Sequence, residues 1–276
     1  MRRKLIVVAD DLGASMAVNS GVVSSYIDGV VTSASLLVGM PYTADGISRA
    51  KDVELPLGLH LRLTEGPPLT KGPSHYGLCD GGQFLSPIRL LTRLIKGGSQ
   101  LADVIQAEIR AQMDEFLMIT SKPDHINTHH HIHLHPLVLR PLICAARDLD
   151  FPALRWPVEP LLGFGKPKRN GEVMALKLLA HFGKTPLRDS DFMTSDHFRG
   201  LRLMDGKLNS KILCQTIMKI PEGVTELMVH PAYGNNATIA GEIEAKALCD
   251  SSVQDVINEN NISLSSFRDA VSSLKL

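Results

Sequence analysis

The sequence lacks an excess of charge of either sign. Its 276 residues include 29 lysines and arginines and 29 aspartates and glutamates, so the formal net charge is zero. A protein that binds nucleic acid by neutralising phosphates needs a basic excess, and a disordered chain has fewer apolar residues than the 44% found here. The composition therefore excludes both classes and favours a folded chain that buries a sizeable core.

Long apolar runs are also missing. No window holds the roughly 20 consecutive apolar residues that a membrane-spanning helix needs. The apolar residues 5–8 are too few for the hydrophobic region of a secretory signal, and no small-residue cleavage site follows them. We therefore expect no transmembrane segment and a cytoplasmic location.

Cysteine is scarce, and common nucleophile motifs are missing. The four cysteines are spread along the chain without Cys-x-x-Cys spacing: Cys79, Cys144, Cys214 and Cys249. This pattern favours reduced thiols over a disulfide framework. The sequence contains neither a glycine-rich phosphate-binding loop nor a Gly-x-Ser-x-Gly motif, and no cysteine stands in a catalytic setting.

What the sequence does contain is an alternation of short apolar runs with helical patterns. Strands are expected over residues 5–9, 35–38, 57–63, 124–129, 153–156 and 226–230. Helices are expected over residues 17–28, 101–117, 136–147 and 265–274. Such alternation predicts βα units and a parallel sheet, and the length is close to the ~250 residues of a (β/α) barrel. We therefore predict an α/β, (β/α) barrel-like fold.

Two stretches interrupt this alternation. Residues 64–100 and 157–200 contain several glycines and prolines. We interpret both as loop excursions of the kind that build lids and substrate pockets. No linker or internal repeat is visible, so we expect residues 1–276 to form a single domain.

Histidine is the residue type with an unusual distribution. Six of the eleven histidines fall within residues 125–135. We place His129 and His131 at the carboxyl end of the expected strand, with His133 in the loop that follows. Neutral imidazole is the commonest nitrogen ligand for divalent metals, and ligands at positions i and i+2 can converge on one ion. A lone histidine is more simply a hydrogen-bonded structural residue, but this density favours a metal site.

Ionisable residues also follow other expected strands. Asp10 and Asp11 follow the first strand, His60 lies near the end of the third, and His230 ends the last. Adjacent carboxylates diverge, so one could bind a metal while the other acts as a base, although a helix N-cap with an acidic first turn is equally simple. In α/β barrels, active sites are built where the strands end. His197, in the second excursion, could approach a substrate from there.

A mixed set of aspartate and histidine leaves coordination positions open, which is typical of catalytic metal sites. Such a metal polarises a carbonyl and acidifies water, a neighbouring carboxylate takes the proton, and a histidine donates a proton to the departing amine. The set therefore predicts metal-assisted hydrolysis of an amide or ester. Two histidines and a carboxylate suit zinc by ligand softness, but the site could accept other divalent ions, magnesium among them.

Five short motifs carry a family resemblance. Residues 6–13 read Ile-Val-Val-Ala-Asp-Asp-Leu-Gly, residues 31–35 Val-Thr-Ser-Ala-Ser, residues 58–61 Gly-Leu-His-Leu, residues 125–133 His-Ile-Asn-Thr-His-His-His-Ile-His, and residues 229–232 Val-His-Pro-Ala. In order and spacing they resemble the YdjC-like carbohydrate deacetylases, a family that includes chitooligosaccharide deacetylases. The resemblance covers most of the chain. It implies a barrel-like fold related to polysaccharide deacetylases and the removal of N-acetyl groups from amino sugars.

The resemblance also implies roles for individual residues. It implies that Asp11, His60 and His129 bind a divalent metal ion, Mg²⁺ or Zn²⁺. It implies that Asp10 is the catalytic base and that His230 is the catalytic acid. A homodimer is implied in the same way.

Further motifs resemble one branch of this family, the hopanoid-biosynthesis-associated proteins called HpnK. They lie at residues 133–136, 154–160 and 196–201. This resemblance implies a lipid-linked substrate, an N-acetylglucosaminyl hopanoid, and residues 161–164 are a candidate apolar groove for it. His131 and His133 match the rest of the histidine motif and are expected to contact substrate or to support the ligands. Leu12 stands where the family often has an aromatic residue.

Two alternatives stay open at the level of the sequence. One is an amidohydrolase-type barrel that hydrolyses a small cyclic amide, although such barrels place a His-x-His pair on the first strand and an aspartate on the last, the reverse of the order here. The other is a non-enzymatic metal-binding protein, in which the histidine run is the whole site. The second alternative predicts several weakly held ions and no dependence on His60 or Asp11.

Overall fold

A computed structural model of the chain describes residues 3–72, 77–96, 100–120, 122–160, 170–188, 190 and 192–274. Its centre is a seven-stranded sheet in which every pairing is parallel. In spatial order the strands are β6 (Ile126–Thr128), β3 (Leu57–Leu61), β2 (Ser33–Leu36), β1 (Arg3–Leu12), β8 (Gly223–Val229) and β7 (His197–Arg199), with β9 (Ser263–Leu264) paired to β1. The predicted α/β, barrel-like fold is therefore confirmed.

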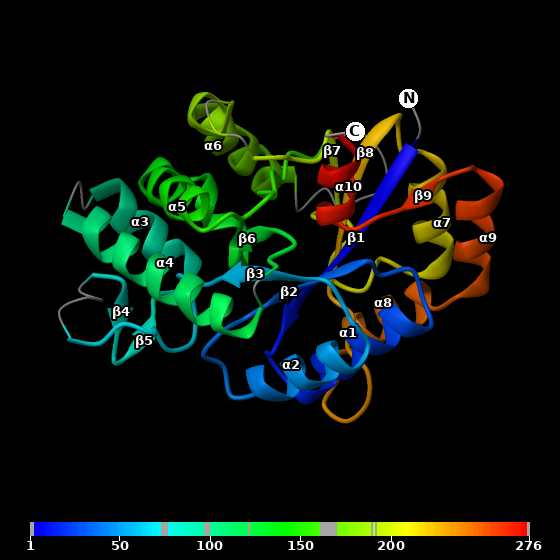
Figure 1. Cartoon of the computed structure of the whole chain (residues 1–276), viewed down its shortest axis with the longest axis horizontal. Helices are drawn as coiled ribbons and strands as arrows, with labels where there is room; N and C mark the ends of the chain where they lie inside the picture. Colours follow the sequence, from blue (N-terminus) through cyan, green and yellow to red (C-terminus); the bar gives the residue numbers. More distant parts are fainter. Residues whose placement is uncertain are drawn as a thin grey trace.

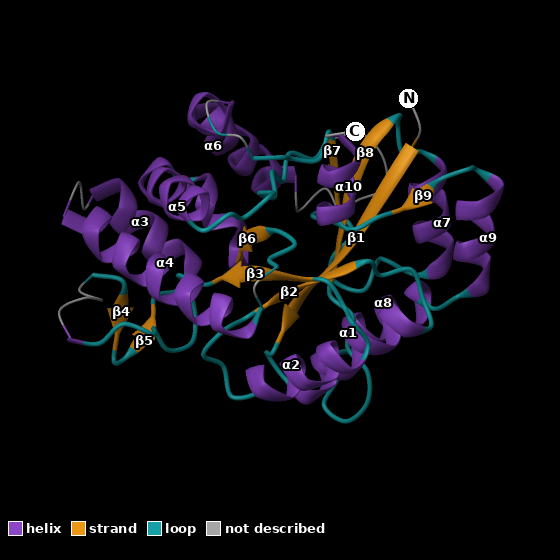
Figure 2. Ribbon diagram, viewed as in Figure 1, coloured by secondary structure: helices purple, strands orange, loops and turns teal. Residues whose placement is uncertain are grey.

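Helices surround this sheet (Figure 1). They are α1 (Met16–Ile27), α2 (Thr43–Asp52), α3 (Pro87–Lys96), α4 (Gln100–Ile119), α5 (Pro136–Asp148), α6 (Asn170–Arg188), α7 (Ser210–Met218), α8 (Ile239–Leu248), α9 (Ser251–Glu259) and α10 (Phe267–Leu274). Figure 2 shows α3, α4 and α5 to the left of the sheet, α7 and α9 to its right, and α1, α2 and α8 below it. Among the described residues, no helix is both long enough and apolar enough to cross a bilayer.

The strongest apolar patterns form the centre of the core. Residues 5–9 of β1 are fully buried, because β1 lies between β2 and β8 and both of its faces are covered. The side chain of Ser15 caps α1 by accepting a hydrogen bond from the backbone N–H of Val18. The four expected helices correspond to α1, α4, α5 and α10, each with ends displaced by no more than a few residues.

Two expectations need correction. Residues 153–156 form no strand and make only isolated bridges, Ala153 with Met193 and Leu154 with Ile126, because prolines flank this run on both sides. The two excursions also contain regular structure. The first holds α3 and the hairpin of β4 (Cys79–Asp80) and β5 (Gln83–Phe84), and the second holds α6 and β7. The single domain over residues 1–276 stays a prediction.

The parallel arrangement places the carboxyl ends of four strands at one edge. In the register of the sheet, His60 of β3 pairs with Asn127 of β6, and Ala9 of β1 pairs with Val229 of β8. The residues that follow these strands, or end them, are therefore neighbours in space although they are distant in sequence.

Candidate active site

The two aspartates of β1 lie at an irregularity of the strand. The register between β1 and β2 shifts between Ala9 and Leu12, and Asp11 has a left-handed backbone with φ of 68°. This conformation is uncommon for residues other than glycine and changes the direction of the chain locally. As a result the two adjacent carboxylates have different surroundings. Asp10 is 1% exposed, whereas the side chain of Asp11 is 22% exposed.

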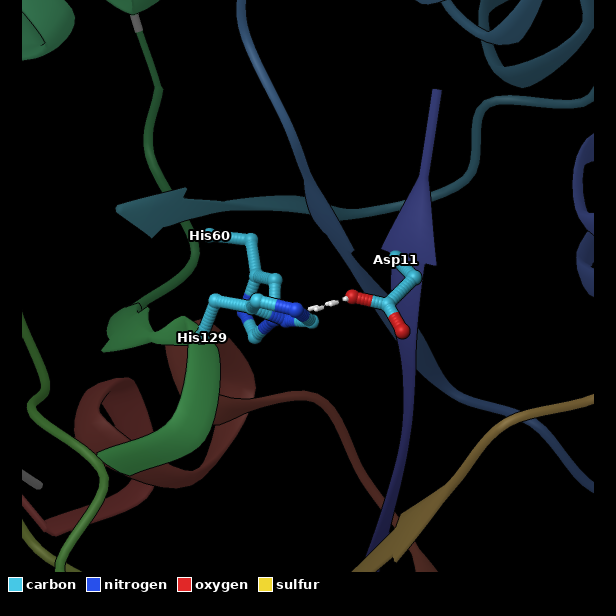
Figure 3. A group of neighbouring side chains, drawn as sticks. All are labelled: Asp11, His60 and His129. Atoms are coloured by element: carbon cyan, nitrogen blue, oxygen red, sulfur yellow. Dashed lines mark hydrogen bonds and ion pairs between the residues drawn. The ribbon is translucent and has the colours of Figure 1, made fainter. Parts of the chain in front are cut away.

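Asp11 faces two histidines that are distant in sequence. Its Oδ1 lies 3.2 Å from Nε2 of His60 and 3.1 Å from Nδ1 of His129, and the two ring nitrogens are 3.2 Å apart. Figure 3 shows both imidazoles pointing toward the carboxylate. His60 comes from β3, and His129 begins a short 3₁₀ segment, η2 (His129–Leu134), directly after β6.

These separations fit a divalent cation. Ligand atoms about 2.0–2.1 Å from a tetrahedral zinc ion are roughly 3.3 Å from one another. Oδ1 of Asp11 is buried, and apart from its close contacts with these two rings it has no hydrogen-bond partner; a cation would supply one. Burial raises the pKa of Asp11, but His129 and His60 outweigh burial and hold the pKa well below its usual range. The carboxylate is therefore ionised, as metal binding requires.

Asn127 fixes the orientation of His60. Its Oδ1 lies 2.6 Å from Nδ1 of His60. Because an amide oxygen only accepts, Nδ1 carries a proton, and Nε2 is the ring nitrogen that faces the other two candidate ligands. The amide nitrogen of Asn127 donates to Ser35 at 2.8 Å and to Asp10 at 3.2 Å. One side chain thus contacts both a candidate ligand and the candidate base.

A second group of metal-binding residue types shares one histidine with the first. Ligand atoms of Glu65, His129 and His130 also lie within 4.8 Å of one another. Glu65 is exposed, and Nδ1 of His130 already lies 2.9 Å from Oγ1 of Thr64. Exposed carboxylates commonly occur without a metal, so the more buried group is the better candidate site.

Asp10 is paired with a buried arginine. Both of its carboxylate oxygens accept hydrogen bonds from the guanidinium of Arg155, one of them at 2.9 Å. Nε of Arg155 donates to Oε1 of Glu226 at 2.5 Å. Burial raises the pKa of Asp10, but Arg155 and His60 outweigh burial and hold the pKa below its usual range. Asp10 is therefore an anion held in place by charge-assisted hydrogen bonds.

One cleft contains the predicted residues at the ends of the strands. His230 follows β8, and its backbone N–H donates to Oε2 of Glu244 at 2.6 Å. Glu244 is itself buried, and burial raises its pKa. The cleft is lined by all five residues predicted as metal ligands, base or acid: Asp10, Asp11, His60, His129 and His230.

The other two histidines of the motif have different surroundings. His133 is fully buried, with Nδ1 at 2.7 Å from Oγ1 of Thr128 and Nε2 donating to the backbone oxygen of Arg155 at 2.9 Å. Burial lowers its pKa to about 3, so the ring is neutral. His131 is 7% exposed and lines the cleft. His133 thus supports the site from the interior, while His131 is placed to meet a ligand.

The remaining wall of the cleft is largely apolar. It includes Leu201, Met204 and Met228, together with the carboxylate-bearing side chain of Glu172. Glu172 belongs to the first turn of α6, so the second excursion contributes to the cleft as expected.

His197 lies elsewhere, which corrects the expectation that it approaches a substrate. It pairs with Thr225 near the start of β8, and its Nε2 donates to the backbone oxygen of Glu222 at 3.2 Å. Because β7 and β8 are parallel, this position is toward the amino-terminal edge of the sheet, whereas the cleft forms at the carboxyl edge.

Sequence analysis missed the residues that hold the site together. Asn127 is two residues from His125 and two from His129, so on the expected strand all three side chains lie on one face. This spacing was the feature of the sequence that could have indicated Asn127. Arg155 and Glu226 are charged residues within apolar runs, and buried charges need partners. Glu244 carries no comparable signal, because its contact with His230 depends on how α8 packs.

Comparisons with known proteins point to one family. A family model described as "YdjC-like protein" matches residues 4–259. The chain is 32% identical to a carbohydrate deacetylase of Brevibacillus brevis, over 96% of this chain and 98% of that protein. It is 28% identical to a carbohydrate deacetylase of Vibrio parahaemolyticus, over 98% and 97% respectively. A crystal structure from Enterococcus faecalis, of a protein named for cellobiose-phosphate cleavage, has a TM-score of 0.76 at 25% identity and covers 97% of this chain and 98% of that chain.

Proposed function

The chain belongs to the YdjC-like family, and on that basis we propose that it is a metal-dependent carbohydrate N-deacetylase. Its substrate is a carbohydrate or glycolipid that contains N-acetylglucosamine, and its products are acetate and a free amine. The names of the relatives in Brevibacillus brevis and Vibrio parahaemolyticus support the carbohydrate class.

One observation carries this proposal. The carboxylate of Asp11 and the rings of His60 and His129 meet at distances that suit one cation, and a second carboxylate, Asp10, lines the same cleft. A set of three ligands leaves room for water and substrate on the ion. Asp10 is not one of these three candidate ligands, so its carboxylate can accept a proton.

The residues of the cleft divide the chemistry between them. A divalent cation bound by Asp11, His60 and His129 would polarise the acetyl carbonyl group and acidify water. Asp10 accepts the proton of the water that adds to the acetyl carbon. His230 donates a proton to the nitrogen as the carbon–nitrogen bond breaks, so that acetate and an amine leave. The ligand set suits Zn²⁺ by softness, and Mg²⁺ is the second candidate.

The finer proposal is a lipid-linked substrate, such as an N-acetylglucosaminyl hopanoid. The apolar wall of the cleft supports it. Further support comes from α6, the helix that contributes Glu172 to the cleft. Three apolar side chains on this helix are spaced four residues apart and are exposed: Met174, Leu178 and Phe182. The candidate groove at residues 161–164 lies outside the described residues.

The proposal is tested by mass spectrometry of N-acetylated chitooligosaccharides and N-acetylglucosaminyl lipids after incubation with metal-loaded protein. We expect loss of one acetyl group with release of an equal amount of acetate, and no reaction in the presence of a chelator. Asp10→Asn should bind the metal normally but lower kcat at least about a hundredfold, because it removes the base. His197→Ala is the matched control and should react like the native protein.

Two results would contradict different parts of the proposal. Full turnover by Asp10→Asn would show that the base is assigned wrongly. A panel that stays intact would contradict deacetylation itself. Opening of a small cyclic amide would then favour the amidohydrolase alternative, and uptake of several weakly held ions without turnover would favour a metal-binding protein.

A homodimer and a cytoplasmic location stay predictions. They follow from the family resemblance and from the sequence composition respectively, and neither enters the chemistry proposed for the cleft.

A further inference from the structure

We propose that His131 is a substrate-binding residue, whose imidazole forms a hydrogen bond with a hydroxyl group of the sugar in the cleft. The inference rests on the proposed function and deepens it. It assigns a contact with the sugar, in addition to the metal ligands and the groups that transfer protons.

The first observation is that His131 has no hydrogen-bond partner among the described residues. Its Nδ1 is buried and unpaired. Each of three other buried histidines, by contrast, has a partner from the protein: His60, His125 and His133. A buried polar atom without a partner costs free energy, so native structures rarely retain one without a reason.

The second observation is the backbone of the same residue. His131 has φ of 54° and ψ of 27°, and the preceding His130 has φ of 57° and ψ of 19°. Two successive left-handed residues other than glycine are strained, and such strain concentrates at functional sites.

The third observation is the place of the ring. It lines the cleft that also contains Asp10 and the candidate metal ligands. Phe198 and His133 pack edge-on against it, with ring centroids 6.2 and 6.4 Å away. These neighbours hold the imidazole in place without giving it a hydrogen bond.

A sugar hydroxyl is the group that best completes this arrangement. A hydroxyl both donates and accepts, so it can pair with a ring nitrogen in either tautomer of a neutral imidazole. A site built to bind a hydroxyl also discriminates strongly against an analogue that lacks it, because the polar group of the protein is then left unpaired.

The test compares His131→Asn with a matched variant, His133→Asn. Asparagine tolerates the left-handed conformation, so the first variant removes the imidazole without adding strain. The probe is N,N′-diacetylchitobiose, with monodeoxy analogues that each lack one hydroxyl. Affinity is measured by calorimetry in the Asp10→Asn background, where the sugar stays intact. The kinetic constants are measured with Asp10 present.

We expect His131→Asn to weaken binding and to lower kcat/KM about tenfold, with metal content and Tm no lower than native. One monodeoxy analogue should bind about tenfold more weakly than the parent sugar to the protein with His131, but equally well to His131→Asn. His133→Asn should instead lower Tm, because it removes two buried hydrogen bonds.

Three results would overturn the inference. The first is unchanged affinity and kcat/KM in His131→Asn. The second is the same discrimination against every analogue with and without the imidazole. The third is a loss of Tm or metal in His131→Asn as large as in His133→Asn, which would make the residue structural. If the protein binds the sugar but releases no acetate, the proposed function fails, and the affinities still decide the role of His131.

Discussion

At the scale of single residues, Arg155 connects Asp10, the proposed base, to the histidine segment. Its guanidinium donates to Asp10 and Glu226, and its backbone oxygen accepts from His133. Burial lowers the pKa of Arg155, but the two carboxylates outweigh burial and raise the pKa above its usual value. The arginine is therefore charged and balances the charge of Asp10, while burial raises the pKa of the second carboxyl group, that of Glu226. Removing one member of such a buried network typically costs about 3–5 kcal/mol, because the remaining charges are left unpaired.

Also at this scale, His133 makes stability depend on pH. Burial lowers its pKa to about 3 in the folded protein, against about 6.5 in an unfolded chain. Above about pH 6.5 neither state is protonated there, and the contribution to stability is fully present. As the pH falls toward 3, only the unfolded chain takes up the proton, so stability falls by about 1.4 kcal/mol per pH unit.

The measurement is the free energy of unfolding in denaturant, from about pH 7 to about pH 5, on metal-free protein. In His133→Asn we expect the free energy of unfolding to depend less steeply on pH than in the native protein. The difference should be up to about 1.4 kcal/mol per pH unit, which corresponds to one proton. Equal slopes in the two proteins would contradict the assignment of a neutral, buried imidazole.

At the scale of elements, the turn between β1 and α1 fixes the end of the strand that carries the two aspartates. Gly13 in this turn has φ of 96°, and its N–H donates to Oδ1 of Asn19 at 2.7 Å. The amide of Asn19 in turn donates to the backbone oxygen of Tyr42 at 3.0 Å. A Cβ atom added to Gly13 would lie 2.9 Å from the backbone oxygen of Leu37, so the turn has no room for a side chain.

The corresponding prediction concerns Gly13→Ala. We expect a loss of about 2–3 kcal/mol in the free energy of unfolding and a weaker metal affinity, since the turn must move and Asp11 moves with it. Denaturant unfolding and metal titration measure the two effects. Gly81→Ala is the matched control, because Gly81 also has a positive φ of 58° but nothing within 4 Å of the added Cβ. Equal losses in both variants would show that close packing of the turn is unimportant.

Some elements could be predicted from the sequence, and others could not, for identifiable reasons. The apolar run of β1 and the helical stripe of α4 are long and regular, so their patterns were sufficient. The histidine segment has the parity of a strand, yet it turns into η2 because His130 and His131 are left-handed. Histidine adopts that conformation more often than most residues do, but most histidines are not left-handed, so the residue type alone did not predict the turn. Helices α3 and α6 were hidden among the glycines and prolines of the excursions.

At the scale of the whole molecule, the parallel sheet explains why the site could be anticipated. Residues at the carboxyl ends of β1, β3, β6 and β8 meet at one edge, so the ends of predicted strands gave the positions of five site residues. The partners that support them could not be anticipated. Asp10 and Arg155 are 145 residues apart, and only the packed fold brings them together.

The same architecture predicts that metal binding stabilises the whole fold, because the three candidate ligands, Asp11, His60 and His129, come from the ends of three different strands. Zinc at about a hundred times its Kd should add about 2.7 kcal/mol to the free energy of unfolding, and a chelator should remove the gain. Thermal unfolding measures the effect as a rise in Tm. His197→Ala should show the same rise as the native protein, whereas His60→Ala should show little. An equal rise in His60→Ala would exclude the site described here.

The irregularity in β1 has a consequence for how such a site tolerates change. Asp10 and Asp11 are the same amino acid, so their different surroundings, and the different roles proposed for them, depend on backbone torsion and not on side-chain type. Inserting one residue upstream in the strand would keep both aspartates in the sequence but move Asp10 to the position of Asp11, and Asp11 to the position of Leu12. A substitution in this segment therefore alters one side chain, whereas an insertion or deletion displaces both carboxylates at once.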